Sequence, residues 1–222
     1  MCHRFSQHSP VSRYARLFGI EPHWSEAPHY NVAPASEVIV LRSTAERGRE
    51  LVHMRWGLLS EGAGGTGMIN AHADERLGKN PAFGERRCLV PVDGFFEWQA
   101  GESRPYYVRR RDGEPFALAG IWEPAEREGK QVETFSIIVT AANELLRPIG
   151  EEMPVIVGPH EYFLWLRPDV HDITRLRPML LSYPSEELEV VPVSEAVNDV
   201  GNDGPELLAR VETGEGVRPE AP

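Results

Sequence analysis

The chain has 222 residues, is 41% hydrophobic and 9% aromatic, and carries a formal net charge of −11. This length suits one large domain with a sizeable core, and the negative charge argues against tight nonspecific binding to duplex DNA, which depends on phosphate neutralisation. Cys2 and Cys88 are too few for a disulfide framework or a cysteine-based zinc site, and the eight histidines lack metal-ligand spacing, so we expect no metal and no cofactor.

The signals of a membrane or secreted protein are also missing from the sequence. No run approaches about 18 uninterrupted apolar residues, and the N-terminal residues lack the apolar core of a signal peptide. We therefore expect a cytoplasmic monomer with no membrane partner. Nearly all basic residues are arginines, which suit phosphate contacts and stacking on bases, so a local groove for nucleic acid remains open.

The first part of the chain alternates short elements with turns. An apolar spacing that ends at Gly19 predicts a helix over residues 11–18. Three prolines within residues 21–36 predict an ordered loop, and two strand-like runs around a charged turn predict a hairpin between residues 38 and 56. The glycine-rich segment 61–67 predicts a flexible loop.

Strands dominate the rest of the chain. We predict them at residues 88–92, 106–109, 116–121, 134–140 and 190–193. Short helices are predicted at residues 142–146 and 159–166. Many short strands with few short helices indicate an α+β domain built on antiparallel sheet. We expect a single domain over residues 1–212 and a disordered tail over the Gly-, Glu- and Pro-rich residues 213–222.

The N-terminus carries an unusual pair of reactive groups. Cys2 follows Met1, and a small residue at this position permits removal of the initiator methionine. The product is a cysteine with a free α-amine, whose pKa of about 7.7–8 leaves a good fraction neutral near pH 7. That amine condenses with an aldehyde to an imine, and the adjacent thiol then closes a thiazolidine ring. For a Met-Cys start alone, the simpler interpretation is that position 2 is merely permissive.

Two polar residues stand in surroundings that suit chemistry. Glu97 is the one carboxylate within the aromatic segment 94–98, and apolar surroundings raise a carboxylate pKa into the range of a general acid or base. Asn70 follows the glycine-rich segment closely. Taken alone, Glu97 also fits a half-exposed strand residue, and Asn70 also fits a turn residue.

Seven short motifs occur in order along the chain, between residues 1 and 198. They are Met1 to Phe5, Tyr30 to Pro34, Arg55 to Leu58, Asn70 to Asp74, Gly94 to Trp98, Gly150 to Pro154, and Val193 to Asn198. Each motif alone is weak, but the ordered set resembles the SOS-response-associated peptidase (SRAP) family of abasic-site processing proteins.

The resemblance implies an α+β fold in which mostly antiparallel sheets form a barrel-like core with a few short helices. It also implies a sensor in the DNA damage response that binds single-stranded DNA and traps the aldehyde of an abasic site as a covalent thiazolidine on Cys2. This activity combines self-removal of Met1, as an autopeptidase, with crosslinking or lyase-type chemistry. By the same resemblance Asn70 would hold the Cys2 amine, Glu97 would move protons, and the DNA would meet Arg4, Trp98 and Arg55.

The chain departs from the family pattern near these residues. It has His3 for a glycine, His72 for an arginine, Asp74 for a glutamate, Gly150 for a histidine and Glu152 for an arginine. The lost histidine removes general acid–base help, which is typically worth about 10²–10⁴-fold. His3 and His72 are the candidate substitutes, with surface or core roles as the alternative. The lost arginines predict weaker binding to single-stranded DNA.

Two other functions remain open at this point. The chain fits a divergent paralogue that keeps the fold as a DNA-binding or regulatory module with weak or no crosslinking chemistry. It also fits an N-terminal-nucleophile protease that acts on other proteins, although the sequence offers no recognisable oxyanion-hole element or substrate pocket. The joint presence of Cys2, Asn70 and Glu97 favours the abasic-site function over both.

Overall fold

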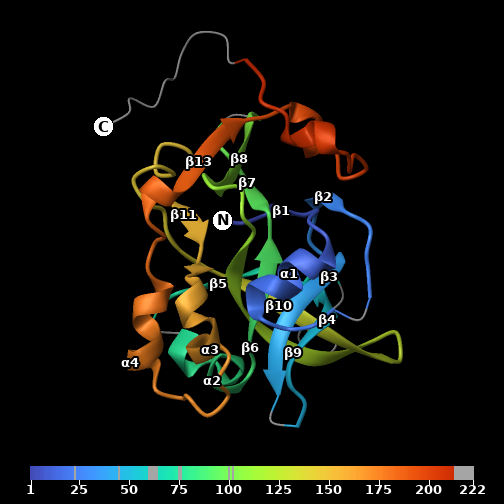
Figure 1. Ribbon diagram of the computed structural model, residues 1–222, viewed down its shortest axis with the longest axis vertical. Coiled ribbons are helices and arrows are strands. Elements are labelled where there is room, and N and C mark those ends of the chain that lie inside the picture. The colour runs from blue at the N-terminus through green and yellow to red at the C-terminus, as the bar shows by residue number, and fades with distance from the viewer. Residues whose placement is uncertain are drawn as a thin grey trace.

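The computed structural model describes residues 1–212 except 23, 45, 60–64, 75–76, 100 and 102. Two β-sheets make up most of it (Figure 1). The smaller sheet is antiparallel and contains β1 (Arg4–Gln7), β2 (His29–Val32), β7 (Gly94–Trp98), β8 (Pro105–Arg110) and β13 (Leu188–Pro192). Its strand order is β13-β8-β7-β1-β2, so the N-terminal strand lies between β7 and the edge strand β2.

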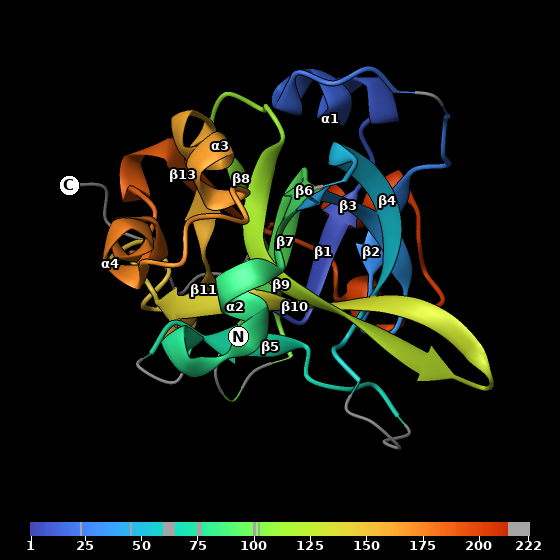
Figure 2. The same cartoon turned by 90° about the horizontal axis from the view of Figure 1, so that it is seen from below.

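Five strands of the larger sheet close into a barrel. They are β3 (Glu37–Thr44), β4 (Gly48–Trp56), β6 (Arg87–Val92), β9 (Phe116–Arg127) and β10 (Lys130–Ala141). Strand β10 closes the barrel because it pairs with β9 along one edge and with β4 along the other. The turn end of the β9–β10 hairpin projects away from the barrel (Figure 2).

Three short strands extend the rim of this barrel. β5 (Asn70–His72) pairs with β10, β11 (Glu152–Pro154) pairs with β10 on its other side, and β12 (Ile156–Val157) pairs with β9. The side chains of β10 alternate between two cores, as a strand requires. Ile137 and Val139 enter the larger core cluster together with Cys2, whereas Ile138 enters a second cluster on the opposite face.

The helices are short and lie outside the sheets. They are α1 (Val11–Phe18), α2 (Pro81–Glu85), α3 (Tyr162–Trp165) and α4 (Ile173–Leu176). Single 3₁₀ turns are η1 (Leu77–Lys79), η2 (Pro159–Glu161), η3 (Arg177–Leu180), η4 (Ser185–Glu187), η5 (Glu195–Asn198) and η6 (Pro205–Leu208). Helix α1 ends at Gly19, whose φ of 63° is the left-handed C-cap that glycine adopts without strain. Among the described residues, no helix is both long and apolar enough to cross a membrane.

The predicted fold class is confirmed, as are the helix over 11–18, the hairpin and the later strands. The predicted loop over 21–36 was wrong in part, because residues 29–32 form β2 between Pro28 and Pro34, and an edge strand tolerates prolines at its ends. The predicted helix over 142–146 was also wrong. Asn143 holds this segment as a turn, since its side chain accepts from Leu146 N and donates to Tyr183 O.

Other predictions need a smaller adjustment or stay untested. The segment 159–166 is helical, but it is divided into η2 and α3 rather than forming one helix. Strands β9 and β10 run longer than predicted, because they continue into their shared hairpin. The predicted tail over 213–222 and residues 61–64 of the predicted flexible loop lie outside the described residues.

Candidate functional site

Cys2 lies at the junction of the two sheets, directly before β1. Strand β1 pairs with β7 in the register Arg4–Phe96, which brings the residues ahead of β1 alongside the end of β7. The Cys2 side chain is fully buried in the larger core cluster, and Figure 1 marks the N-terminus near β1, β7 and β11. Burial raises the pKa of the Cys2 thiol far above its usual value, and the nearby Glu97 carboxylate adds to this. The thiol is therefore neutral and needs a base.

Asn70 holds the Cys2 residue from the rim of the barrel. It is the first residue of β5, and pairing with Ile137 of β10 fixes its position. Its Nδ2 donates a hydrogen bond of 2.9 Å to the carbonyl oxygen of Cys2. Its Oδ1 is buried and, among the described residues, has no hydrogen-bond partner. An unpartnered buried acceptor is rare, and here it leaves a free acceptor beside the N-terminus.

Glu97 approaches the same point from the smaller sheet. Its side chain is 8% exposed, and Oε1 lies 3.6 Å from the α-amino nitrogen of Met1. Oε2 is buried, and no described residue gives it a hydrogen bond. Burial raises the pKa of Glu97 to about 7, although the Met1 ammonium opposes this shift. Glu97 is thus a buried carboxyl with a pKa near neutrality, which is the condition for a general acid–base group.

Gly150 faces this carboxyl. A Cβ atom at position 150 would lie 3.3 Å from Glu97 Oε1 and 3.4 Å from its Cγ, so any side chain here would cover Glu97. A histidine at position 150 would therefore stand directly against the Glu97 carboxyl. Glycine leaves the approach to Glu97 free of a side chain.

The two candidate substitutes for that histidine lie in different places. His72 is on β5, two residues after Asn70, and its Nδ1 lies 2.8 Å from Oε1 of Glu152 on β11. His3 follows Cys2 and is an exposed residue, and partial desolvation of its ring lowers its pKa. The pairing of His72 with Glu152 was missed from the sequence, because the two positions are far apart in the chain and meet only through β10.

Two of the predicted DNA contacts touch the C-terminal segment. Arg4 Nη1 donates to Asn31 Oδ1 and to the carbonyl of Val197, each at 3.0 Å. Trp98 Nε1 donates to Asn198 Oδ1 at 2.7 Å. These bonds fasten residues 197–198 over β1 and β7.

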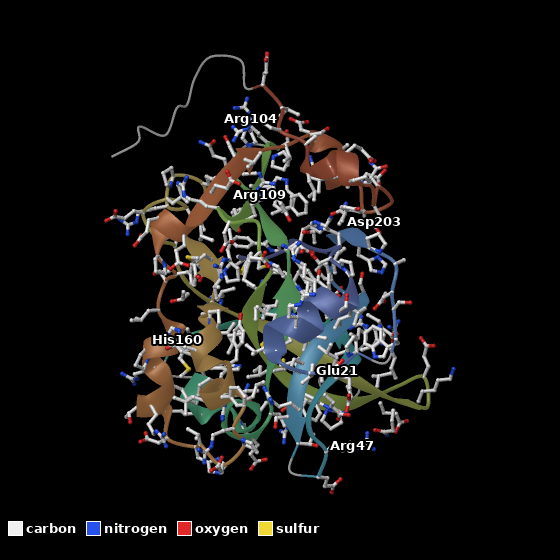
Figure 3. All side chains as sticks on the ribbon, viewed as in Figure 1. Glu21, Arg47, Arg104, Arg109, His160 and Asp203 are labelled. Atoms are coloured by element: carbon white, nitrogen blue, oxygen red, sulfur yellow. The ribbon has the colours of Figure 1, made fainter. Side chains whose placement is uncertain are left out.

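Asn31 is a second residue that the sequence interpretation missed. It is buried, and its Nδ2 donates to the carbonyls of Val197, Asp199 and Asn202. Asp203 completes this attachment by accepting from the backbone N–H of Asn31, and Figure 3 shows it beside β2. The sequence did contain one indication of this attachment, because Asn31 and Asn198 each belong to one of the seven motifs.

Arg55 is placed differently from Arg4 and Trp98. It is buried, and its guanidinium donates to the carbonyls of Gly57, Gly65 and Thr66, so it holds the loop that leads to β5. Because these donors point into the protein, its direct contact with DNA stays a prediction.

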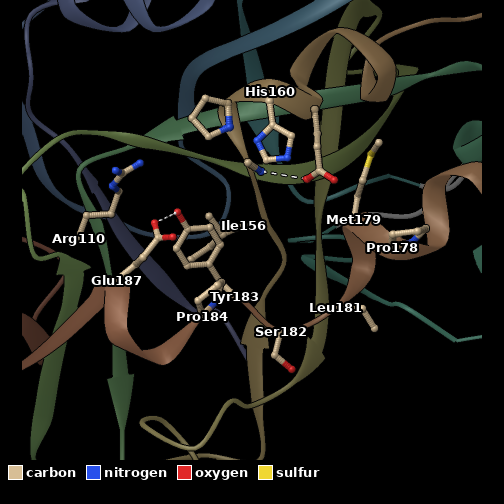
Figure 4. A pocket seen from close by; sticks show the side chains of 13 residues that line it. Arg110, Ile156, His160, Pro178, Met179, Leu181, Ser182, Tyr183, Pro184 and Glu187 are labelled. Atoms are coloured by element: carbon tan, nitrogen blue, oxygen red, sulfur yellow. Dashed lines mark hydrogen bonds between the residues drawn. The ribbon is translucent and has the colours of Figure 1, made fainter.

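A separate hollow of about 340 Å³ lies between β12 and η4 (Figure 4). It shares no lining residue with the Cys2 site, and its Tyr183 hydroxyl is bonded to Glu187. Within the described part of the chain, no group of three or more His, Cys, Asp and Glu side chains is arranged to hold a metal ion.

Comparison with known proteins gives a consistent result. Residues 1–200 match the family described as SOS response associated peptidase (SRAP). The abasic site processing protein YoqW of Bacillus subtilis (strain 168) is 33% identical over 223 residues, covering 94% of this chain and 99% of YoqW. YedK of Escherichia coli (strain K12), with the same description, is 29% identical over 95% of this chain and 100% of its own length. HMCES of Gallus gallus is 30% identical over 87% of this chain and 70% of its own.

A solved structure supports the fold. The crystal structure of a protein from Bacteroides thetaiotaomicron matches with a TM-score of 0.81 at 23% identity, covering 95% of this chain and all of that one. The family match covers most of the described residues and includes every element of the Cys2 site. The chain therefore belongs to the SOS response associated peptidase (SRAP) family.

Proposed function

We propose that this protein processes abasic sites in single-stranded DNA by trapping the lesion aldehyde on Cys2 as a thiazolidine, after Met1 has been removed. The observation that carries the proposal is the enclosure of Cys2 by Asn70 and Glu97, each with one buried polar atom that lacks a partner in the described part of the chain. Its relatives YoqW, YedK and HMCES are all described as abasic site processing proteins.

The chemistry begins with removal of Met1. The Met1 α-amine stands 3.6 Å from Glu97 Oε1, so the carboxyl lies beside the first peptide bond and serves to protonate the departing Cys2 amine during hydrolysis. The freed amine then stays beside Asn70, whose unpartnered Oδ1 accepts a hydrogen bond from it. This bond directs the nitrogen lone pair toward an incoming aldehyde.

Ring formation then needs three proton transfers. The Glu97 carboxylate first takes a proton from the Cys2 ammonium, which gives the neutral amine. The Cys2 amine adds to the aldehyde carbon, and Glu97 protonates the hydroxyl of the adduct, which leaves as water and gives an iminium. The buried thiol next gives its proton to Glu97 and adds through sulfur to the same carbon, closing the ring. A carboxyl with a pKa of about 7 is suited to both directions of transfer at neutral pH.

The DNA strand approaches over β1 and the C-terminal segment in this proposal. Arg4 lies two residues after Cys2 and pairs with Phe96, which lies two residues before Trp98, and both Arg4 and Trp98 are half-buried. Arg4 offers charge to a phosphate, and Trp98 offers an aromatic surface to a base. Arg55 supports the site by holding the loop before β5.

The experiment is incubation of Met1-free protein with a single-stranded oligonucleotide that contains one abasic site, followed by a denaturing gel. We expect a shifted band that survives denaturation and is absent with Cys2→Ala. The absence of a band with wild-type protein, or an equal band with Cys2→Ala, would contradict the proposal.

A second candidate is a binding module of the same fold that has weak or no crosslinking chemistry. The specific observation in its favour is Gly150, which leaves Glu97 without the adjacent side chain that the family pattern places there. In the same experiment this candidate predicts binding of the abasic oligonucleotide under native conditions but no band after denaturation.

A further inference from the structure

The His72–Glu152 pair stands at the rim of the barrel, on two strands that flank β10. His72 lies opposite Val139 and Glu152 lies opposite Ala141, and their side chains meet at 2.8 Å. The His72 side chain is 45% exposed and that of Glu152 is 28% exposed. This pair is therefore in contact with solvent, unlike Glu97.

The pair belongs to the same face as the Cys2 site. Asn70 and His72 are two residues apart on β5, so their side chains project to one side of the strand. Their partners Ile137 and Val139 pack in the core cluster that contains Cys2. Asn70 and His72 also line one hollow of about 250 Å³, and His72 and Glu152 line an adjoining one of about 540 Å³. A continuous surface thus leads from Asn70 to Glu152.

Gly150 opens the route from this surface to Glu97. Gly150 precedes Glu152 by two residues, and a Cβ there would already contact the Glu97 carboxyl. Position 150 therefore contributes no side chain to the space between Glu97 and the start of β11. The negatively charged Glu152 is one of the groups that raise the pKa of the Glu97 carboxyl.

The crosslinking reaction requires such a route because it releases a proton. The Cys2 amine enters as an ammonium and the thiol carries its own proton, whereas the product thiazolidine keeps a single neutral N–H. Formation of one ring and one water from ammonium, thiol and aldehyde therefore yields one proton. Glu97 accepts this proton, and with only 8% of its side chain exposed it needs a path to solvent.

We propose that His72 and Glu152 form a proton-exchange couple that passes the released proton from Glu97 to solvent through the opening at Gly150. This inference rests on the proposed function, which it deepens by assigning the proton exit. His72 and Glu152 are positioning residues here, because they act through Glu97 and do not touch the reacting atoms. Among the described residues, no carboxylate pairs with His3, whose ring is affected by burial and by the neighbouring Met1 and Arg4.

The charges around the couple define the test. Glu97 faces the Met1 or Cys2 amine, the Cys2 thiol, Tyr106 on β8 and Glu152. Asp74 and Glu151 line the same hollows as His72. Removal of Glu152 takes a negative charge away from Glu97 and lowers the pKa of Glu97, whereas removal of His72 leaves the Glu152 carboxylate without its partner at 2.8 Å and raises the pKa of Glu97. The two substitutions therefore act in opposite directions.

The experiment measures the rate of crosslinking to an abasic oligonucleotide as a function of pH. We expect the midpoint assigned to Glu97 to move down by about 0.5 pH unit in Glu152→Gln and up by about the same amount in His72→Gln. The double variant should return to near the wild-type midpoint with a reduced maximal rate. The matched control is His160→Gln, an exposed histidine in the separate hollow of Figure 4, which should leave the profile unchanged.

Two results would overturn the inference while leaving the proposed function intact. One is a wild-type crosslink whose pH profile is unmoved, or moved in one common direction, by Glu152→Gln and His72→Gln. The other is a shift produced by His3→Gln and not by His72→Gln. A wild-type protein that forms no crosslink at any pH would instead overturn the proposed function, and the inference with it.

Discussion

Two carboxylates at opposite ends of β7 belong to the same sheet but have different hydrogen-bond partners. Asp93, just before β7, accepts hydrogen bonds from the backbone N–H groups of His8 and Ser9 at 2.7 and 2.8 Å, and from the Ser9 and Tyr14 hydroxyls. Glu97, four residues later, has one oxygen near the Met1 amine and the other without a partner. Each carboxylate holds one end of β1 in place, but only Glu97 has an oxygen that is available for proton transfer.

This difference separates a structural role from a chemical one. A carboxylate that accepts several hydrogen bonds is stable as an anion and holds its neighbours in place. A buried carboxyl with an unpartnered oxygen is costly to ionise, and this cost is what brings its pKa to about 7. Ionisation of the buried Glu97 carboxyl therefore lowers the stability of the fold, as is common at functional sites.

The largest expected effect comes from Glu97→Gln. Loss of the proton-transferring group should slow crosslinking by about 10²–10⁴-fold.

The same substitution should raise the folding stability at high pH. The folded protein holds the Glu97 proton more tightly than an unfolded chain, so the related stability is full below about pH 4.5 and is lost as pH rises through about 7. At pH 8 the variant should therefore be more stable by about 1–3 kcal/mol.

Thermal or urea unfolding at pH 4.5 and pH 8 measures this change, with gel-based rates in parallel. A variant that is less stable than wild type at pH 8 would show that the Glu97 carboxylate is a structural group like Asp93.

Asp93→Asn should give the reverse result. An amide cannot accept all the bonds that the carboxylate accepts, so we expect a loss of about 2–4 kcal/mol of folding free energy. The folded fraction should crosslink at close to the wild-type rate, because the bonds of Asp93 lie at the far end of β1. Urea unfolding and single-turnover crosslinking below the transition check both parts. A rate loss comparable to that of Glu97→Gln would contradict the assignment of a purely structural role to Asp93.

Gly150→His tests the approach to Glu97 from the other side. The new ring would lie against the carboxyl with contacts of 3.3–3.5 Å at its Cβ, which requires only a small adjustment of the Glu97 side chain. We expect crosslinking to become about 10-fold faster, a part of the usual gain from a general acid–base group, because the imidazole itself would carry the proton through the opening that its side chain fills. Gly150→Ala is the control, since it adds the Cβ without an imidazole and should give no acceleration. Equal rates for the two variants would contradict this account.

Arg4→Ala should have the smallest effect among these changes. It removes a charge from the proposed DNA path and two hydrogen bonds that fasten the C-terminal segment. We expect affinity for single-stranded DNA to fall by a few-fold and the slope of log affinity against log salt to decrease by about 0.7. Fluorescence anisotropy at several salt concentrations measures both. An unchanged salt slope would limit Arg4 to holding the C-terminal segment.

The sequence predicted the main parts of the fold because its alternating patterns are local. The hairpin of β3 and β4 and the helix α1 with its Gly19 cap depend on neighbouring residues, and both were found. The segment around β2 was not, because its strand character comes from pairing with β1 rather than from its own proline-flanked residues. The turn at Asn143 likewise depends on Tyr183, a distant residue.

The site shows the same limit. Cys2, Asn70 and Glu97 were predictable as an ordered set of motifs, and the structure brings them together. The unpartnered atoms of Asn70 and Glu97 were not predictable, because burial and missing partners are properties of the assembled sheets. The pairing of His72 with Glu152 also needed the register of β5 and β11 on β10.

The most direct test of the central claim is the intact mass of the protein after reaction with an abasic oligonucleotide. We predict a species that has lost Met1 and gained the oligonucleotide minus one water, in which the Cys2 thiol no longer reacts with iodoacetamide. A crosslinked species that retains Met1, or one whose Cys2 thiol remains free, would contradict thiazolidine formation at Cys2.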